Sequence, residues 1–130
     1  MILQHKMKHS TSIPEITSLI NEFCDERDWK QFHSPKDMAI SINIEAAELL
    51  EHFQWKSESE CTDHIRENRE AVADEIADVG IYLFEMADLL GLDLGDEMTR
   101  KIGVNASKYP VKSSKGSHRK STDIQSEKDL

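Results

Sequence analysis

Helix-start signals and helical periodicity constrain this fold more than any other feature of the sequence. Residues 12–15 (Ser-Ile-Pro-Glu) have the form of a capping box with proline in the first turn. Ser34-Pro35, followed by Asp37, repeats the arrangement. Apolar residues then recur every three or four positions, whereas alternating stretches are few and neither Asn-Gly nor Asp-Gly occurs. The sequence therefore predicts an all-α protein.

Four helices with short links are expected, an arrangement typical of a helical bundle. The first runs from the capping box to about Asp28, and the second starts at Ser34-Pro35. A polar loop is predicted over 56–63. The third helix is predicted over 65–90, with Gly91 as its C-cap, and the fourth from Asp93 to just before Pro110.

The domain boundaries follow from composition. We expect a flexible N-terminus over 1–11, one folded domain over 12–110 and a disordered tail over 111–130. The tail is rich in Ser, Lys and Asp and carries one large aliphatic side chain, Ile124, before the terminal leucine.

Charge and cysteine content narrow the class of partner. The 130 residues carry a formal net charge of -9, and the basic tail makes the remainder more acidic still. This argues against binding a nucleic-acid polymer, but not a small phosphorylated ligand that arrives with its own magnesium.

No apolar run or signal peptide indicates a membrane or secretion, so we expect a cytoplasmic protein. Cys24 and Cys61 have neither metal-site spacing nor a disulfide framework and are interpreted as incidental.

Two short acidic motifs carry the chemistry. Glu45-Ala-Ala-Glu48 and Glu75-Ile-Ala-Asp78 each place two carboxylates three residues apart, on one face of a predicted helix. Both motifs lie among apolar residues, where carboxylates are costly unless they are paired or bind a metal. Oxygen-only ligands suit Mg²⁺, with Mn²⁺ as a substitute, better than zinc. Solvated acidic faces are the alternative interpretation.

With its flanking blocks, this pattern resembles the all-α nucleoside triphosphate pyrophosphohydrolases of the MazG type, most closely their dCTP pyrophosphatase group. The resemblance covers about residues 15–110, and the 26-residue gap between the motifs lies in the family's range. The blocks that carry it are Glu26-Arg27-Asp28-Trp29, Phe32-His33-Ser34-Pro35, the two acidic motifs, Phe53-Gln54-Trp55, Ile81-Tyr82-Leu83, Lys101, Asn105 and Lys108-Tyr109-Pro110.

The resemblance implies a Mg²⁺-dependent enzyme that cleaves a (d)NTP, dCTP or a modified pyrimidine dNTP, to the monophosphate and pyrophosphate, and so clears surplus nucleotides. It implies a homotetramer built as a dimer of dimers, with sites between subunits. Glu48 is the preferred water-activating group, although sequence does not separate it from Glu45 or Glu75. The implied substrate contacts are Trp29, His33, Trp55 and Tyr82 toward the base, and Lys101 and Asn105 toward the phosphates.

Two features limit what the resemblance implies. Ile20 stands where dCTP-preferring relatives have a histidine, so we expect a looser preference among pyrimidines. The kcat/KM values for dTTP or dUTP should lie within about two orders of magnitude of the value for dCTP. His52, one turn beyond Glu48, is interpreted as a surface or edge residue and not a metal ligand. The rival functions are a noncatalytic helical regulatory or partner protein, an all-α dUTPase and a phosphoribosyl-ATP pyrophosphohydrolase.

Overall fold

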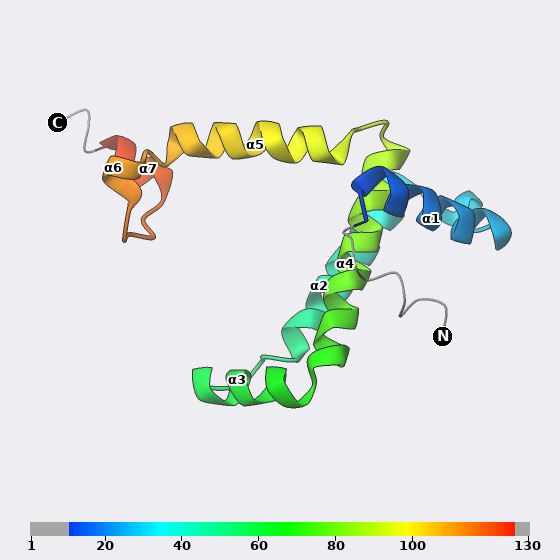
Figure 1. Cartoon of the computed structure of the whole chain (residues 1–130), viewed down its shortest axis with the longest axis horizontal. Coiled ribbons are helices and arrows are strands. Elements are labelled where there is room, and N and C mark those ends of the chain that lie inside the picture. The colour runs from blue at the N-terminus through cyan, green and yellow to red at the C-terminus, as the bar shows by residue number, and fades with distance from the viewer. Residues whose placement is uncertain (1–10, 127–130) are drawn as a thin grey trace. The chain divides into compact units, whose positions relative to one another are not determined.

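The structure, a computed structural model, describes residues 11–126, and the side chains up to Ile124. It confirms the all-α prediction, since no strand occurs in this range. The chain divides into two units, one ending at Leu92 and one beginning at Asp93. The helices are α1 (Ile13–Glu26), the 3₁₀ helix η1 (Lys30–Phe32), α2 (Pro35–Glu51), α3 (Glu58–Glu67), α4 (Arg69–Leu89), α5 (Leu94–Lys108), α6 (Val111–Ser114) and α7 (Ser121–Ser126) (Figure 1).

The two predicted helix starts are confirmed. Ser12 caps α1, where its hydroxyl accepts a hydrogen bond from the Glu15 amide at 3.3 Å. Ser34 caps α2 in the same way, accepting from the Asp37 amide at 3.1 Å. Proline occupies the first turn of both helices, where its missing N–H leaves no intrahelical bond unmade.

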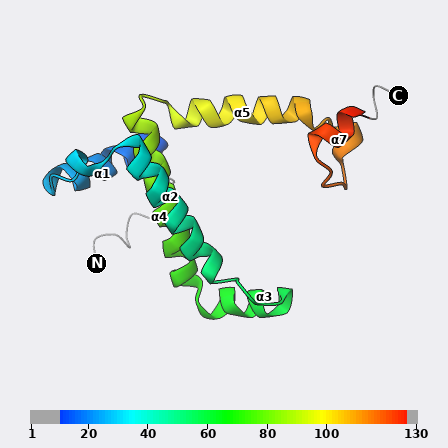
Figure 2. The same ribbon diagram turned by 180° about the vertical axis from the view of Figure 1, so that it is seen from behind.

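Helices α2 and α4 lie side by side and antiparallel, and this pair is the frame of the first unit (Figures 1 and 2). Helix α1 packs against the C-terminal half of α4, where Asn21 Nδ2 donates to Asp88 Oδ2 at 3.0 Å. The core of the first unit is small, and its buried apolar side chains are Ile20, Cys24, Met38, Val72 and Ala87.

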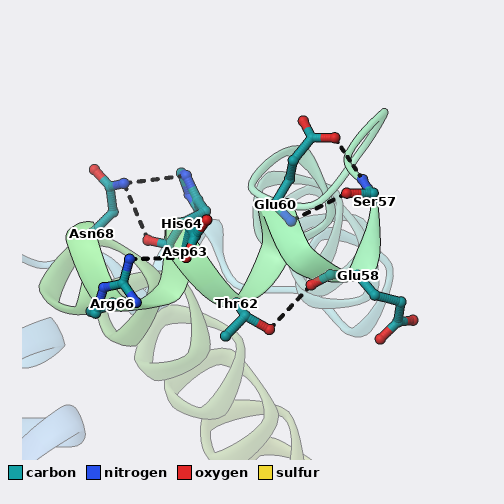
Figure 3. A network of polar contacts seen from close by, with 8 residues as sticks. All are labelled: Ser57, Glu58, Glu60, Thr62, Asp63, His64, Arg66 and Asn68. Carbon is teal, nitrogen blue, oxygen red and sulfur yellow. Dashed lines mark hydrogen bonds and ion pairs between the residues drawn. The ribbon is translucent and has the colours of Figure 1, made fainter.

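Helix α3 corrects the prediction for the segment between the acidic motifs. A polar loop was expected over 56–63 and one helix over 65–90, but α3 occupies 58–67 and a break at Asn68 separates it from α4. Its N-terminus is a full capping box: the Glu60 amide donates to Ser57 Oγ, and the Ser57 amide donates to the Glu60 carboxylate (Figure 3). At the other end, Asn68 Nδ2 donates to the His64 carbonyl oxygen at 3.2 Å (Figure 3). Local polar contacts thus stabilise a helix that has little apolar content.

Gly91 ends α4 as predicted. Its φ of +67° is in the left-handed region, which glycine adopts without the Cβ penalty. The Leu92 amide donates to the Ala87 carbonyl oxygen at 2.8 Å across this turn, so one of the terminal carbonyls of α4 is satisfied.

The second unit contains α5, α6 and α7. Asp93 caps α5, its carboxylate accepting from the Asp96 amide at 2.9 Å. Two short helices lie where a disordered tail was expected, and Ile124 is only 3% exposed there. The composition of the tail did not indicate this burial. Residues 1–10 of the flexible N-terminus predicted over 1–11, and residues 127–130, lie outside the described residues. None of the helices within 11–126 has the length and apolarity that crossing a bilayer requires.

Candidate active site

Three of the four predicted carboxylates meet between α2 and α4. Glu45 and Glu48 from α2 and Glu75 from α4 each have a carboxylate oxygen within 4.8 Å of the other two. We call these three residues the carboxylate cluster. The spacing of three places Glu45 and Glu48 on one face of α2, and the antiparallel pairing sets Glu75 opposite them.

Burial and like charge make the carboxylate cluster unstable without a counter-charge. Burial raises the pKa of Glu45, and hydrogen bonding and repulsion from Glu48 raise it further. Burial likewise raises the pKa of Glu75, with Glu48 again the next cause. The Oε2 atoms of Glu45 and Glu75 are buried and receive no hydrogen bond from the described residues. Such a donor set, with oxygens free toward the cluster, fits a hard divalent cation.

Asp78, the fourth predicted ligand, lies at the edge of the carboxylate cluster. Its oxygens are outside the set that lies within 4.8 Å. Its charge nevertheless contributes to the raised pKa of both Glu45 and Glu75, so it is close to them. It follows Glu75 by three residues on the same face of α4.

Two histidines border the carboxylate cluster on its α3 side. His52 Nδ1 lies 2.8 Å from His64 Nε2, so one of the two rings donates to the other. Burial lowers the pKa of His64, with the charges of Lys56 and His52 as further causes. Both rings, together with Glu51, line an open hollow that Glu48 and Glu75 also border. Glu51 and His64 were missed from sequence, because only the position of α3 brings His64 to this hollow.

The predicted aromatic contacts do not all meet within one chain. Tyr82 is one turn beyond Asp78 on α4; burial raises its pKa, and the charges of Glu45 and Glu85 raise it further. Trp29 follows α1 and packs edge-on against Phe23, with ring centroids 5.5 Å apart. Trp55 lies beyond the far end of α2, a helix of about 25 Å, and is 91% exposed. Trp55 therefore does not join Trp29 in the same chain.

The predicted phosphate contacts lie in the second unit. Lys101 and Asn105 are both exposed on α5, and their spacing of four places them on one face of the helix. Lys108 follows three residues after Asn105, in the last turn of α5. The face thus presents two ammonium groups and one amide to solvent.

A second cluster was missed from sequence. Cys24 of α1, His33 after η1 and Glu85 of α4 have ligand atoms that all lie within 4.8 Å of one another. Cys24 Sγ donates to Glu85 Oε1 at 3.6 Å, and His33 Nδ1 lies 3.2 Å from Glu85 Oε2. We call these three residues the Glu85 cluster. Cys24 is therefore not incidental, and the one available signal was that Glu85 follows Asp78 by seven residues on the same face of α4.

Comparisons with known proteins match the chain to one family and to several relatives. Residues 40–124 match the MazG-like family. Mouse dCTP pyrophosphatase 1 is 38% identical over 115 residues, which cover 87% of this chain and 68% of that protein. The human protein of that name is 36% identical over the same shares. A pyrophosphatase from Archaeoglobus fulgidus, whose crystal structure is known, is 39% identical to this chain in sequence. The two structures match with a TM-score of 0.73, and the match covers 81% of this chain and 99% of the pyrophosphatase chain.

The chain belongs to the MazG-like family. Within that family it is a nucleotide pyrophosphohydrolase, which confirms the resemblance seen in the sequence. The alternative of a noncatalytic helical partner protein is thereby set aside.

Proposed function

We propose that this enzyme hydrolyses a pyrimidine deoxynucleoside triphosphate, dCTP or a modified form of it, to the monophosphate and pyrophosphate. The observation that carries the proposal is the carboxylate cluster, whose buried oxygens lack hydrogen-bond donors. Similarity to dCTP pyrophosphatase 1 of mouse and human supports the choice of base. The physiological role would be to clear surplus or noncanonical nucleotides.

Glu45, Glu48 and Glu75 would hold Mg²⁺, with Asp78 completing the set from its edge. When bound, the cation would polarise the phosphate oxygens and offset the charge that builds up during in-line displacement. Glu48 contributes to the raised pKa of both Glu45 and Glu75, so it lies beside both, and it is the preferred group to orient and deprotonate the attacking water.

The remaining predicted residues would bind the two ends of the nucleotide. Lys101 and Asn105 would contact the phosphates, lysine as a point charge and asparagine as a hydrogen-bonding group. Tyr82, one turn from Asp78, would pack against the nucleoside. Trp29 and His33 would approach the base from the end of α1.

We further propose that the active form is a homo-oligomer, as a dimer of dimers. Several large apolar side chains of α2 and α4 are exposed, more than a stable monomer usually leaves in water. Trp55 is almost fully exposed with a left-handed φ of +64°, a conformation that a tryptophan adopts only when its surroundings favour it. A second copy would cover this ring and bring it to a base site. The exposed side chains include Ile40, Ile44, Leu50, Ile76 and Leu83.

The test is a nucleotide panel with Mg²⁺ at one concentration. All canonical dNTPs, dUTP and 5-methyl-dCTP are compared by kcat/KM, with pyrophosphate and orthophosphate measured separately. We expect pyrophosphate as the product and dCTP or 5-methyl-dCTP as the best substrate. Release of orthophosphate, or a purine as best substrate, would reject the proposal.

A further inference from the structure

The Glu85 cluster is a built polar site in the contact between α1 and α4. Cys24 is 2% exposed and the Glu85 side chain 11%. A carboxylate placed so deeply is costly unless its oxygens accept hydrogen bonds. Glu85 is therefore held between α1 and α4 at an energetic cost that packing alone does not explain.

One oxygen of Glu85 is without a proper donor. Cys24 Sγ donates to Oε1, whereas Oε2 is buried and receives no well-aligned hydrogen bond from any described residue. His33 Nδ1 lies 3.2 Å from Oε2 but not in hydrogen-bond alignment with it. The structure thus leaves a buried acceptor that a bound N–H group would satisfy.

Glu85 also lines a pocket that lies along α4 from the carboxylate cluster. The pocket has a volume of about 170 Å³ and is bordered by both apolar and polar side chains. Glu85 is seven residues beyond Asp78, or about 10 Å along the helix axis. This is comparable with the distance from the α-phosphate of a nucleotide to the far edge of its base. Besides Glu85, the pocket is lined by Asn21, Cys24, Lys30, His33, Met38, Asp88 and Leu89.

Tyr82 connects the two clusters. It lies between Asp78 and Glu85 in sequence, at spacings of four and three, so all three share one face of α4. Its phenol is close enough to both Glu45 and Glu85 for each charge to raise its pKa. A nucleotide whose phosphates lie at the carboxylate cluster would therefore pass Tyr82 and reach Glu85 with its base.

Resting on the function proposed above, we propose that Glu85 is the residue that selects the base, by accepting a hydrogen bond from the exocyclic 4-amino group of cytosine. Carboxylates pair with this amino group in other recognition sites. Uracil and thymine present an oxygen at the same position, which would face the carboxylate without a proton between them. Cys24 and His33 are positioning residues that hold the carboxylate in place.

This assignment changes the expected selectivity. The sequence predicts a preference within about two orders of magnitude, because Ile20 offers no polar group to the base. A buried carboxylate that needs a donor rejects a base without one far more strongly than stacking does. We therefore expect the wild-type enzyme to prefer dCTP to dUTP by at least about 10³ in kcat/KM.

The test compares Glu85→Gln with wild type on dCTP, dUTP, dTTP and dATP. The glutamine amide can rotate to donate to the 4-oxygen, so the dCTP/dUTP ratio should fall by about 5- to 150-fold. Most of the loss on dCTP should be in KM. Glu70→Gln, an exposed residue on the same helix, is the matched control and should leave the ratio unchanged. The measurement on dATP tests whether any exocyclic amine can donate a hydrogen bond to Glu85. A higher dATP turnover in Glu85→Gln than in wild type would contradict the assignment.

Several outcomes separate this assignment from the function it rests on. If wild type releases no pyrophosphate from any dNTP, the proposed function fails, and the assignment fails with it. If wild type is active but Glu85→Gln keeps the same ratio within about twofold, only the assignment fails. Should Glu85→Gln not fold, the wild-type ratio alone decides, because a dCTP/dUTP ratio within about two orders of magnitude, as expected without a polar group that reads the base, would overturn the assignment. A thiolate-to-metal absorption band on titration with Co²⁺ would instead make the Glu85 cluster a metal centre and overturn it as well.

Discussion

The two clusters on α4 use the same residue type for opposite purposes. In the carboxylate cluster, three glutamates face one another, and burial and like charge raise the pKa values of Glu45 and Glu75, so that a bound cation would relieve the repulsion. In the Glu85 cluster, a single carboxylate faces a thiol and an imidazole, which already supply one hydrogen bond. The number of carboxylates in contact thus separates a site whose donor set fits a metal ion from a site that we propose to bind a hydrogen-bond donor.

The largest effect expected is loss of activity on removal of the metal ion. Exhaustive chelation should abolish turnover, because two buried oxygens of the carboxylate cluster, Glu45 Oε2 and Glu75 Oε2, receive no hydrogen bond from the described residues and would need the cation as their partner. Mg²⁺ or Mn²⁺ should restore turnover, and Zn²⁺ poorly, since the donor set is oxygen only. The measurement is pyrophosphate release after metal is added back to the stripped enzyme. Full turnover after chelation would break the comparison, because the carboxylate cluster would then need no cation.

Replacing Glu48 of the carboxylate cluster, or Asp78 at its edge, should come next in size. Glu48→Gln and Asp78→Asn keep the shape of the side chain and remove its charge. Each should lower kcat by about 10² to 10⁴, as expected for loss of a metal ligand or a positioned base. The helical circular dichroism spectrum should not change.

Glu70→Gln, exposed on α4, serves again as the control and should keep wild-type activity. If Asp78→Asn keeps half of its activity at saturating Mg²⁺, then Asp78 lies outside the site. That result would fit its position at the edge of the carboxylate cluster.

A smaller effect, on stability and not on chemistry, is expected at the Glu85 cluster. Cys24→Ala removes the donor to Glu85 Oε1 and opens space at a residue that is 2% exposed. The free energy of unfolding should fall by roughly 1–3 kcal/mol, the cost of an unsatisfied buried acceptor. Cys24→Ser, which keeps a donor, should lose less. Equal losses in urea denaturation would show that the contact to Glu85 contributes nothing.

The smallest effect expected is on the pH dependence of stability. The native pKa values of Glu45 and Glu75 are raised, so between the unfolded and native values the folded chain binds more protons than the unfolded chain. Stability of the metal-free protein should therefore fall as pH rises through this window. Thermal unfolding from about pH 4 to 7, with and without Mg²⁺, measures it. Mg²⁺ should remove the fall at the upper end, and a metal-free protein that gains stability over this range would contradict the assigned directions.

Local signals explain which parts of the fold could be predicted. Ser12, Ser34 and Gly91 act through contacts within a few residues, and each has the role that the sequence indicated. Helix α3 was missed because its apolar content is low, although Ser57 and Glu60 form the very capping box that identified other helices. A polar helix is thus found by its caps and not by its periodicity.

The candidate site divides in the same way. Glu45 and Glu48 could be placed together from their spacing, and the family pattern added Glu75. Glu85 could not be placed, because its partners come from α1 and from the segment after η1, more than fifty residues away. Pairings of that kind depend on tertiary packing, which periodicity along one helix does not report.

The break at Asn68 has a consequence for how such a chain can change in length. Inserting one residue within either acidic motif would rotate everything beyond it by about 100° about the helix axis and separate the carboxylates. Between the two motifs, α3 packs mainly against α4, and breaks at 52–57 and at Asn68 bound it. Insertions or deletions in this stretch would leave the register of α2 and α4 unchanged. The segment over 52–68 is therefore where this chain can gain or lose residues without losing the carboxylate cluster.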